Sequence, residues 1–320
     1  MVLLLIETVD YRPSYELDAD LADVAYAAVR GWPDQQLITP AAVRSRLRPT
    51  GTAATTLLLA RDGGRLVAAA AMLWPATLEA MGQLIGPLVH PSARGAGLGT
   101  AMLRAAASVA AARPGIAFTA GPIPESRPVG WGLFDKAGWQ PVQTGHLYTA
   151  TLPVVDQPPP SDVPVRPAQP GEYLNQAVAD LVAHAYPRCG HADARDTFTR
   201  WTTDERYRPD GLLLTGDEHG LSGAALVYPQ SDEDAPGPAE AVIADLIVDP
   251  RLDGATAAAV GAALAGAAVR AGASFGAAVA RTVARCPHAG AALASVGFRR
   301  VDQVRYYGCP NALSVLSAVG

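Results

Sequence analysis

The sequence predicts an α/β protein built from two similar halves, and three observations support this. Short apolar segments with strand character alternate with segments whose apolar residues recur at helical spacing. A glycine-rich turn at 90–100 joins one such strand to one such helix. A Pro-rich stretch at 156–164 lies near the middle of the chain, and features on its two sides repeat at a constant offset. We therefore expect strands and helices in both halves, arranged in the same order.

Composition places the chain among globular proteins that are long enough for two domains. Of its 320 residues, 49% are hydrophobic and 17% are charged, so large cores can form. The formal net charge is −5 and no basic cluster occurs, which argues against nucleic acid or an anionic membrane as a partner. The three cysteines lack C-x-x-C spacing, so neither a disulfide framework nor a zinc site is indicated. We expect a cytoplasmic protein that binds no metal.

Two apolar stretches could be mistaken for membrane segments. The chain start, 1–6, has no basic residues before it meets Glu7, unlike a signal sequence. The Ala-rich stretch 255–280 is interrupted by Gly261, Gly266, Arg270 and Gly272. We therefore expect a buried helix followed by a strand there, and no membrane partner.

The elements of the first half follow from local signals taken in order. Apolar residues at 21, 24, 25 and 28 lie on one face of a helix, and Pro40 suits the first turn of the next helix. Asp62-Gly63-Gly64 between two apolar runs is a strong hairpin signal. We expect a strand at 3–9, helices at 18–30 and 40–47, strands at 55–61, 66–74 and 81–89, a helix at 98–112, a strand at 116–120, a helix at 129–137 and a strand at 139–151.

The glycine-rich turn predicts a phosphate-binding site. Gly95, Gly97 and Gly99 let the backbone turn tightly and approach a ligand closely. The first turn of the following helix has N–H groups without intrahelical acceptors, and these lie at the positive end of the helix dipole, so they suit a diphosphate. Arg94 adds a cation at the mouth of the turn. The alternative is a strand-to-helix connection that binds no ligand.

The spacing within this turn carries a family resemblance. Arg94-Gly-Ala-Gly97-Leu-Gly99 fits the pattern Arg/Gln-x-x-Gly-x-Gly/Ala and lacks the Lys-Ser/Thr of a P-loop. Together with the element order and with Gly138-Trp139, it resembles the GNAT superfamily of acyl-CoA N-acyltransferases. The resemblance implies a mixed, mostly antiparallel sheet flanked by helices, with acetyl-CoA or another acyl-CoA as co-substrate. The residues that it implies for acyl-CoA binding are Leu88, Val89, His90, Arg94, Gly95, Ala96, Gly97, Leu98, Gly99, Thr100, Arg127 and Phe134.

The second half repeats the first at an offset of 159 residues. Val89-x-Pro91 recurs as Val248-x-Pro250, and Gly138-Trp139 recurs as Gly297-Phe298. We therefore predict a tandem duplication, similar in layout to that of mycothiol synthases, which are tandem GNAT proteins. The predicted parts are an N-terminal GNAT domain at 1–153, a linker at 154–163 and a C-terminal GNAT-like domain at 164–320.

The glycine-rich turn itself is not repeated. The same offset places Asp253 at the position of Arg94 and Thr256 at that of Gly97. An Asp at a helix N-terminus accepts the free N–H groups itself, and its charge repels a diphosphate. We expect acyl-CoA in the N-terminal domain only; the alternative is binding to the second copy through altered contacts.

At the residues for proton transfer the sequence departs from the family pattern. The family's helix near the thiol commonly carries a Tyr as general acid, and that position holds Phe134. Glu79 and Glu125 are candidate bases, each with the alternative of a solvated loop carboxylate. The resemblance implies an N-acetyltransferase or other acyltransferase in which an amine of a small molecule or peptide attacks the thioester directly. The alternative is a non-catalytic protein that binds or senses acyl-CoA; the chain is expected to be a monomer or homodimer.

Overall fold

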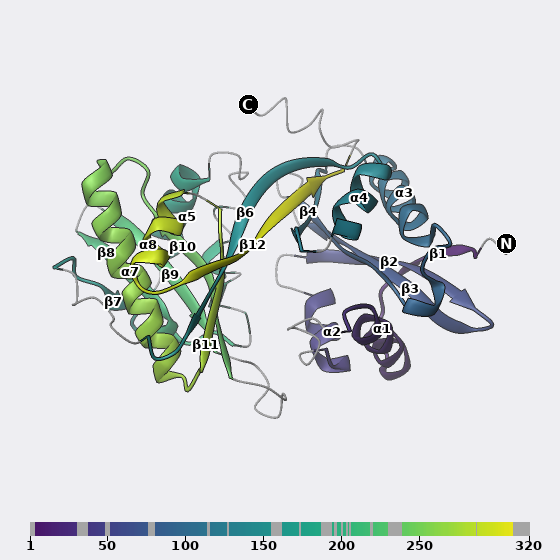
Figure 1. Cartoon of the computed structure of the whole chain (residues 1–320), viewed down its shortest axis with the longest axis horizontal. Coiled ribbons are helices and arrows are strands. Elements are labelled where there is room, and N and C mark those ends of the chain that lie inside the picture. Colours follow the sequence, from purple (N-terminus) through teal and green to yellow (C-terminus); the bar gives the residue numbers. More distant parts are fainter. Residues whose placement is uncertain are drawn as a thin grey trace. The chain divides into compact units, whose positions relative to one another are not determined.

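The structure is a computed structural model in which the chain forms two compact units (Figure 1). Unit 1 contains Met1–Gln143 and Arg305–Gly320, and unit 2 contains Thr144–Val304. The residues that the structure describes are 4–30, 38–48, 52–75, 81–113, 116–126, 128–154, 162–172, 174–186, 194, 197–199, 201–202, 204, 206–217, 220–229, 239–285 and 287–309. Most of the predicted linker, 155–161, lies outside them.

Unit 1 is a mixed sheet with helices on both faces, as the sequence predicts. Its strands follow the order β1-β2-β3-β4-β5, with the end of β12 beside β5. Each strand from β1 to β4 pairs antiparallel with the next, whereas β4 and β5 pair in parallel. The elements are β1 (Ile6–Asp10), α1 (Tyr15–Ala28), α2 (Pro40–Leu47), β2 (Thr52–Asp62), β3 (Arg65–Pro75), β4 (Gly82–Val89), α3 (Leu98–Ala111), β5 (Phe118–Pro124) and α4 (Pro128–Lys136).

Local sequence signals account for several of these boundaries. The side chains of Ser14 and Thr39 cap α1 and α2 by accepting backbone N–H groups of the first turn. Gly63 and Gly64 have φ values of 55° and 85°, and they connect β2 to β3 where the sequence predicts a hairpin.

Alternating residues of the unit 1 strands face two separate cores. Leu58 and Ala60 of β2 pack in the core beneath α3 and α4, whereas Leu57 and Leu59 pack against α1 and α2. This is the two-residue period of a strand that is buried on both faces. The two pairs of helices therefore lie on opposite faces of the sheet (Figure 1).

A buried carboxylate fixes the helices on the α1 side. Asp18 of α1 is fully buried; it accepts a hydrogen bond of 2.5 Å from Tyr11 Oη and pairs with Arg44 Nε of α2 at 2.7 Å. Burial raises the pKa of Tyr11, so the phenol stays a hydrogen-bond donor. Removing Arg44 would leave the buried charge of Asp18 without its ion-pair partner, which is costly. The ion pair therefore fixes the position of α1 relative to α2.

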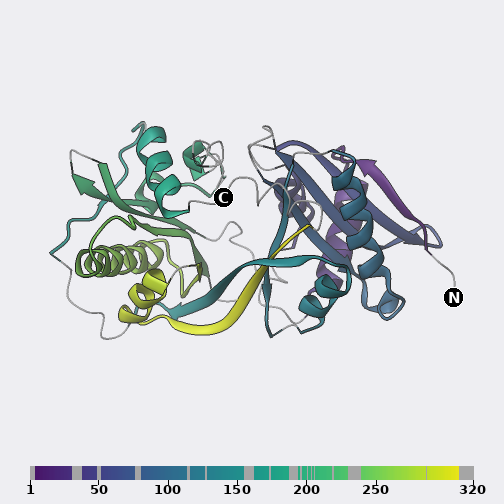
Figure 2. The same ribbon diagram turned by 90° about the horizontal axis from the view of Figure 1, so that it is seen from above.

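Unit 2 repeats the architecture of unit 1. Its strands follow the order β7-β8-β9-β10-β11-β6, and the β10 and β11 strands form a parallel pair. One face is covered by α5 and the other by α7 and α8 (Figure 2). The elements are β7 (Arg166–Pro167), α5 (Asn175–Ala185), β8 (Leu212–Asp217), β9 (Gly220–Tyr228), β10 (Glu240–Val248), α7 (Gly254–Ser274), β11 (Val279–Ala284) and α8 (Pro287–Ser295).

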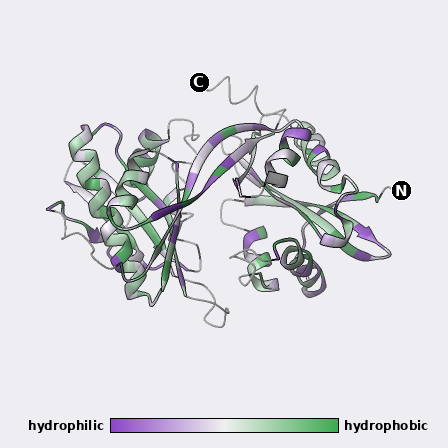
Figure 3. Cartoon of the chain, in the orientation of Figure 1, coloured by the Kyte–Doolittle hydropathy of each residue, from purple (hydrophilic) through white to green (hydrophobic). Residues whose placement is uncertain are grey.

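The predicted duplication is visible in the element boundaries. The bounds of α8 are those of α4 shifted by the offset read from the sequence, and each helix is followed by a positive-φ glycine, Gly138 or Gly297. The Ala-rich segment is the helix α7, followed by β11 as predicted. By length and composition alone α7 could cross a membrane, and most of its residues are buried within unit 2 (Figure 3).

The two units do not coincide with the two halves of the sequence, because the last strand of each half ends in the other unit. Residues 144–151 of β6 (Gln140–Thr151) belong to unit 2, where they pair antiparallel with β11. Residues 305–308 of β12 (Arg299–Gly308) belong to unit 1, and Cys309 N donates to Phe118 O of β5 at 2.9 Å. The predicted domains 1–153 and 164–320 thus exchange the ends of their last strands, which the sequence reasoning did not foresee.

Candidate functional site

The N-terminus of α3 lacks a side-chain cap. Its N-cap residue, Gly97, has φ 80° and ψ 4°, and no side chain bonds to the first turn. Gly95 has φ 83°, and a Cβ on either glycine would meet nothing within 4 Å. The left-handed conformation, rather than crowding, therefore requires these glycines. The backbone N–H groups of the first helical turn have no acceptor within the helix, so they are available for an anion.

Gly99 has a packing role in addition to the one its spacing predicts. It lies within α3, and a Cβ there would lie 3.1 Å from Leu133 Cδ2 of α4. Its missing side chain thus allows α3 to pack closely against α4. Gly95 and Gly97 shape the turn, whereas Gly99 brings the two helices together.

The loop between β4 and α3 is held by local hydrogen bonds. His90 Nδ1 accepts the Ser92 N–H at 3.2 Å and lies 2.7 Å from Ser92 Oγ. The guanidinium of Arg94 donates to Ala28 O at the end of α1 (2.6 Å) and to Val89 O at the end of β4 (3.2 Å). Arg94 is exposed, so the predicted cation stays at the mouth of the turn and also ties α1 to β4.

The parallel strands β4 and β5 separate beyond their first residues. Their pairing runs from Gly82 opposite Phe118 to Leu84 opposite Ala120, and none of the described residues continues it. The pairing of β4 with β3 shifts register between Ile85 and Leu88. We call the parts of these two strands that do not pair with each other, Ile85–Val89 of β4 and Gly121–Pro124 of β5, the strand divergence. Leu88 and Val89, which the sequence assigns to acyl-CoA, lie on its β4 side.

Phe134 is a core residue of unit 1. It is 2% exposed, its ring stacks on that of Tyr307 at 4.8 Å between centroids, and Trp139 meets it edge-on. Tyr307 comes from β12 of the second half. The Tyr307 Oη is buried and has no hydrogen-bond partner in the described part of the chain, and burial raises the pKa of this phenol.

The candidate bases are only partly placed. Glu125 is exposed and directly follows β5 at the end of the strand divergence. Glu79 and Arg127 lie outside the described residues. Within the described residues, no three His, Cys, Asp or Glu side chains form a group that could hold a metal ion.

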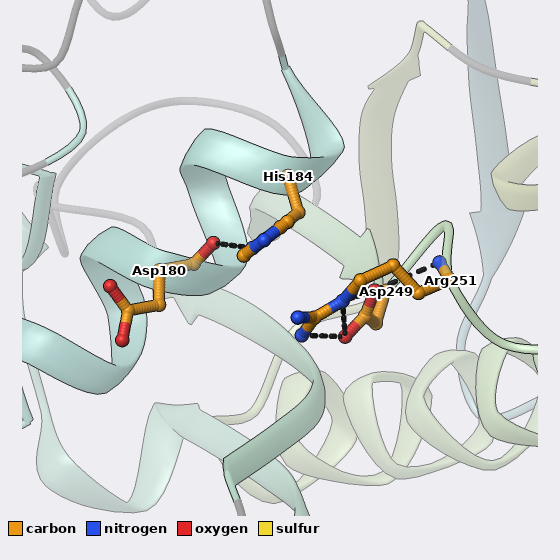
Figure 4. Close-up of polar contacts among 4 residues, drawn as sticks. All are labelled: Asp180, His184, Asp249 and Arg251. Atoms are coloured by element: carbon orange, nitrogen blue, oxygen red, sulfur yellow. Dashed lines mark hydrogen bonds and ion pairs between the residues drawn. The ribbon is translucent and has the colours of Figure 1, made fainter.

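Unit 2 carries carboxylates at the corresponding loop, and Figure 4 shows one of them, Asp249, with its partner Arg251. Asp253 caps α7 by accepting the N–H groups of Ala255 and Thr256, each at 3.0 Å, and it accepts from Thr256 Oγ1 at 2.6 Å. Asp249 is paired with the guanidinium of Arg251, whose hydrogen bonds lower the pKa of that carboxyl. The free N–H groups that unit 1 offers at α3 are therefore occupied by a side chain at α7.

The parallel pair of unit 2 also separates, and a polar bridge spans the separation. The β10–β11 pairing ends at Ile243 opposite Thr282. Just beyond it, Asp245 accepts from Trp201 Nε1 at 3.1 Å and pairs with Arg285 Nη2 at 3.3 Å. Asp245 and Arg285 occupy the positions of Gly86 and Ser126 in unit 1, where no such pair can form.

Comparison with known proteins relates both the sequence and the fold to one family. The sequence model of the acetyltransferase (GNAT) family matches residues 21–139. A GCN5-related N-acetyltransferase from Sphaerobacter thermophilus has a TM-score of 0.67 at 20% identity, over 94% of this chain and 95% of that one. A tandem GNAT protein from the clavulanic acid biosynthesis pathway has a TM-score of 0.64 at 19% identity, over 95% and 98%.

A third similar structure is part of a larger protein. The glucosamine N-acetyltransferase region of a fungal multi-domain β-N-acetylglucosaminidase has a TM-score of 0.71 at 16% identity, and the match covers 96% of this chain and 38% of that one. No match was found among curated protein sequences. Because the sequence identities are low, the solved structures establish the fold alone. The match of the family model to the sequence, together with this fold, confirms the predicted GNAT resemblance.

Proposed function

We propose that this protein is an acyl-CoA-dependent N-acyltransferase whose co-substrate binds unit 1, in which residues 21–139 match the GNAT acetyltransferase family model. The acyl group is acetyl or another acyl group, and the acceptor is an amine of a small molecule or peptide. The observation that carries the proposal is the uncapped N-terminus of α3 behind Gly95 and Gly97. The same helix end in unit 2 is capped by Asp253.

The residues around α3 fit the phosphate end of an acyl-CoA. Open space surrounds the two positive-φ glycines, and the free N–H groups of the first helical turn and the Arg94 cation suit a diphosphate. We assign this end to 94–100, with His90 at its edge. The edge of Leu88 and Val89 that pairs with β3 but not with β5 would take the pantetheine arm and polarise the thioester carbonyl.

In the proposed reaction a neutral amine attacks the thioester carbonyl carbon. The new N–C bond forms, the C–S bond breaks, and its electron pair goes to sulfur. The amine proton leaves to water or to a carboxylate such as Glu125, and a proton from water converts the thiolate to the thiol. Phe134 is a buried hydrocarbon ring and cannot donate this proton, so positioning and backbone polarisation carry most of the catalysis.

The test combines turnover with binding. Acetyl-CoA is incubated with the protein and, separately, with ethanolamine, phenethylamine, tyramine, spermidine or a dipeptide with a free amino terminus, and free thiol is followed. Calorimetry with CoA gives the stoichiometry, which we expect to be one per chain. Thiol release that depends on an amine supports the proposal. Binding of CoA without thiol release for any amine would instead favour the non-catalytic sensor.

The variant Glu125→Gln tests whether Glu125 or water takes the proton from the amine. If Glu125 takes it, Glu125→Gln should lower the rate by about a hundredfold while CoA affinity stays unchanged. Unchanged rates across pH would assign the proton to water or to another group.

A further inference from the structure

The end of β12 brings residues of the second half into unit 1. Arg305–Gly308 belongs to unit 1, and the Cys309 N–H bonds to Phe118 O of β5. Three consecutive side chains, Arg305, Tyr306 and Tyr307, therefore lie beside the strand that borders the strand divergence.

Strand alternation separates these three side chains onto two faces. The Arg305 guanidinium lies 3.7 Å from the ring centroid of Trp131, and Tyr307 stacks on Phe134. Trp131 and Phe134 are both on α4, so Arg305 and Tyr307 face the α3 and α4 side. Tyr306 lies between them and must face the opposite side, the one that α1 and α2 cover.

The ring of Tyr306 lies at the start of the strand divergence. Gly121 is the first residue of β5 beyond its pairing with β4, and it has φ 143°. A Cβ on Gly121 would lie 2.9 Å from Tyr306 Cδ1, so the tyrosine ring covers the glycine backbone. Tyr306 is partly exposed, whereas Tyr307 beside it is fully buried. An aromatic surface thus stands where the sheet first opens, on the side away from α3.

The sheet assigns the two reactants of the proposed function to opposite sides. The diphosphate is held at the N-terminus of α3, on the α3 and α4 face. The thioester can meet an amine arriving from the other face only where β4 and β5 are unpaired. Under the proposed function, a residue that borders this region on the α1 and α2 face is placed to meet the acceptor rather than the CoA nucleotide.

We propose that Tyr306, supplied by the last strand of the second half, is a specificity-determining residue that packs against the amine acceptor in unit 1. This inference rests on the proposed function. A tyrosine ring offers a flat apolar surface, and its face attracts a cationic amine before deprotonation. It favours acceptors whose amino group is attached to an apolar or aromatic body over small polar amines.

The test compares acceptors in matched variants at Tyr306. Phenethylamine, tyramine and ethanolamine are assayed by thiol release with the full-length protein and with Tyr306→Ala, Tyr306→Leu and Tyr306→Phe. We expect Tyr306→Ala to raise KM for the two aromatic amines by about tenfold and to lower their kcat/KM relative to ethanolamine by a similar factor. Tyr306→Phe should stay within about threefold, because it keeps the ring.

Controls separate an acceptor contact from a structural effect. The Kd for CoA from calorimetry should stay within about twofold in all three variants. Tyr307→Phe changes the neighbouring side chain on the other face and should not alter the acceptor profile. Tyr306→Leu keeps a bulky apolar group should Tyr306→Ala not fold, and it should still lose the preference for aromatic amines.

The outcomes distinguish this inference from the proposed function. Thiol release by the wild type that keeps the same acceptor profile in Tyr306→Ala and Tyr306→Leu overturns the inference alone. A weaker Kd for CoA in parallel with the change in KM would also overturn it, because the residue would then act on the co-substrate. Absence of thiol release by the wild type with every amine overturns the proposed function and the inference with it.

Discussion

The N-termini of α3 and α7 occupy equivalent places in the repeat but present opposite chemistry. At α3 a glycine in the left-handed conformation leaves the first N–H groups free, and Arg94 stands beside them. At α7 the Asp253 carboxylate accepts the N–H groups of Ala255 and Thr256 in the first turn and adds a negative charge. One end attracts a diphosphate and the other repels it.

The region in which the two parallel strands separate also differs between the units: it is open in unit 1 and bridged by charged side chains in unit 2. In unit 1 it contains Gly86 and is followed by Ser126, whereas in unit 2 Asp245 and Arg285 face each other across it at 3.3 Å. In contrast, α4 and α8 have equivalent bounds in the two copies, and each is followed by a positive-φ glycine at the equivalent position. Core positions thus preserve the fold in both copies, and we expect that a few loop and strand-end residues decide whether each copy binds acyl-CoA.

The largest effect should come from removing the strand end that unit 1 takes from the second half. Truncation after Val304 removes Tyr307 and Cys309, both fully buried in the unit 1 core. Loss of one buried aromatic side chain costs about 3–5 kcal/mol, a large part of a domain's stability. We expect CoA binding to be lost and the thermal unfolding of unit 1 to be abolished or strongly lowered.

Truncation after Cys309 is the matched control, since it removes 310–320, which the other truncation also removes, and keeps the described strand. It should retain CoA binding by calorimetry. If the chain truncated after Val304 binds CoA as well as the wild type does, unit 1 does not depend on the exchanged strand.

The second effect follows from moving the carboxylate of unit 2 into unit 1. Gly97→Asp places a negative charge and a new N-cap at α3, so we expect CoA affinity to fall by about a hundredfold or more. Gly63→Asp is the control: it puts the same side chain at another positive-φ glycine with open surroundings, in the β2–β3 hairpin. Calorimetry on both variants decides, and tight binding to Gly97→Asp would mean that CoA is held elsewhere.

Much of the fold and part of the site could be predicted from the sequence because their signals are local. Helical periodicity, the hairpin glycines and Pro40 correctly predict α2 and the β2–β3 hairpin, and Asp253 caps α7 as expected. The helical role of Gly99 was missed, because a glycine that brings two helices together has the same appearance in sequence as one that shapes a turn.

The exchange of strand ends could not be predicted for a different physical reason. The alternation in β6 and β12 specifies a strand, but it is the same whichever sheet the strand joins. Consequently the residues that β12 brings beside β5, including Tyr306, could not be assigned to the site. Equal spacing in both halves was the only available signal, since the repeat aligns Tyr307 with Tyr148 of β6.

A smaller effect concerns stability rather than binding. The Tyr307 Oη is buried without a hydrogen-bond partner in the described part of the chain, and such a group costs about 1–3 kcal/mol. Tyr307→Phe keeps the ring stacked on Phe134 and should stabilise unit 1 by about 1 kcal/mol, measured by denaturant unfolding. Tyr148→Phe, at the equivalent position of β6, is the comparison variant. A large loss of turnover in Tyr307→Phe would instead assign the phenol to catalysis.

The smallest effect should come from the reverse change, in which the N-terminus of α7 loses its carboxylate cap and is given glycines. Asp253→Gly with Thr256→Gly frees the N–H groups of α7 and removes the negative charge. The polar bridge of Asp245, Arg285 and Trp201 still spans the strand divergence of unit 2, so an acyl-CoA arm finds no unpaired backbone there. We therefore expect calorimetry with CoA to give one site per chain, as in the wild type, with only a slightly lower melting temperature from the lost cap. A second site of comparable affinity would show that the helix cap alone separates the two units and that the bridge has no part in excluding the ligand.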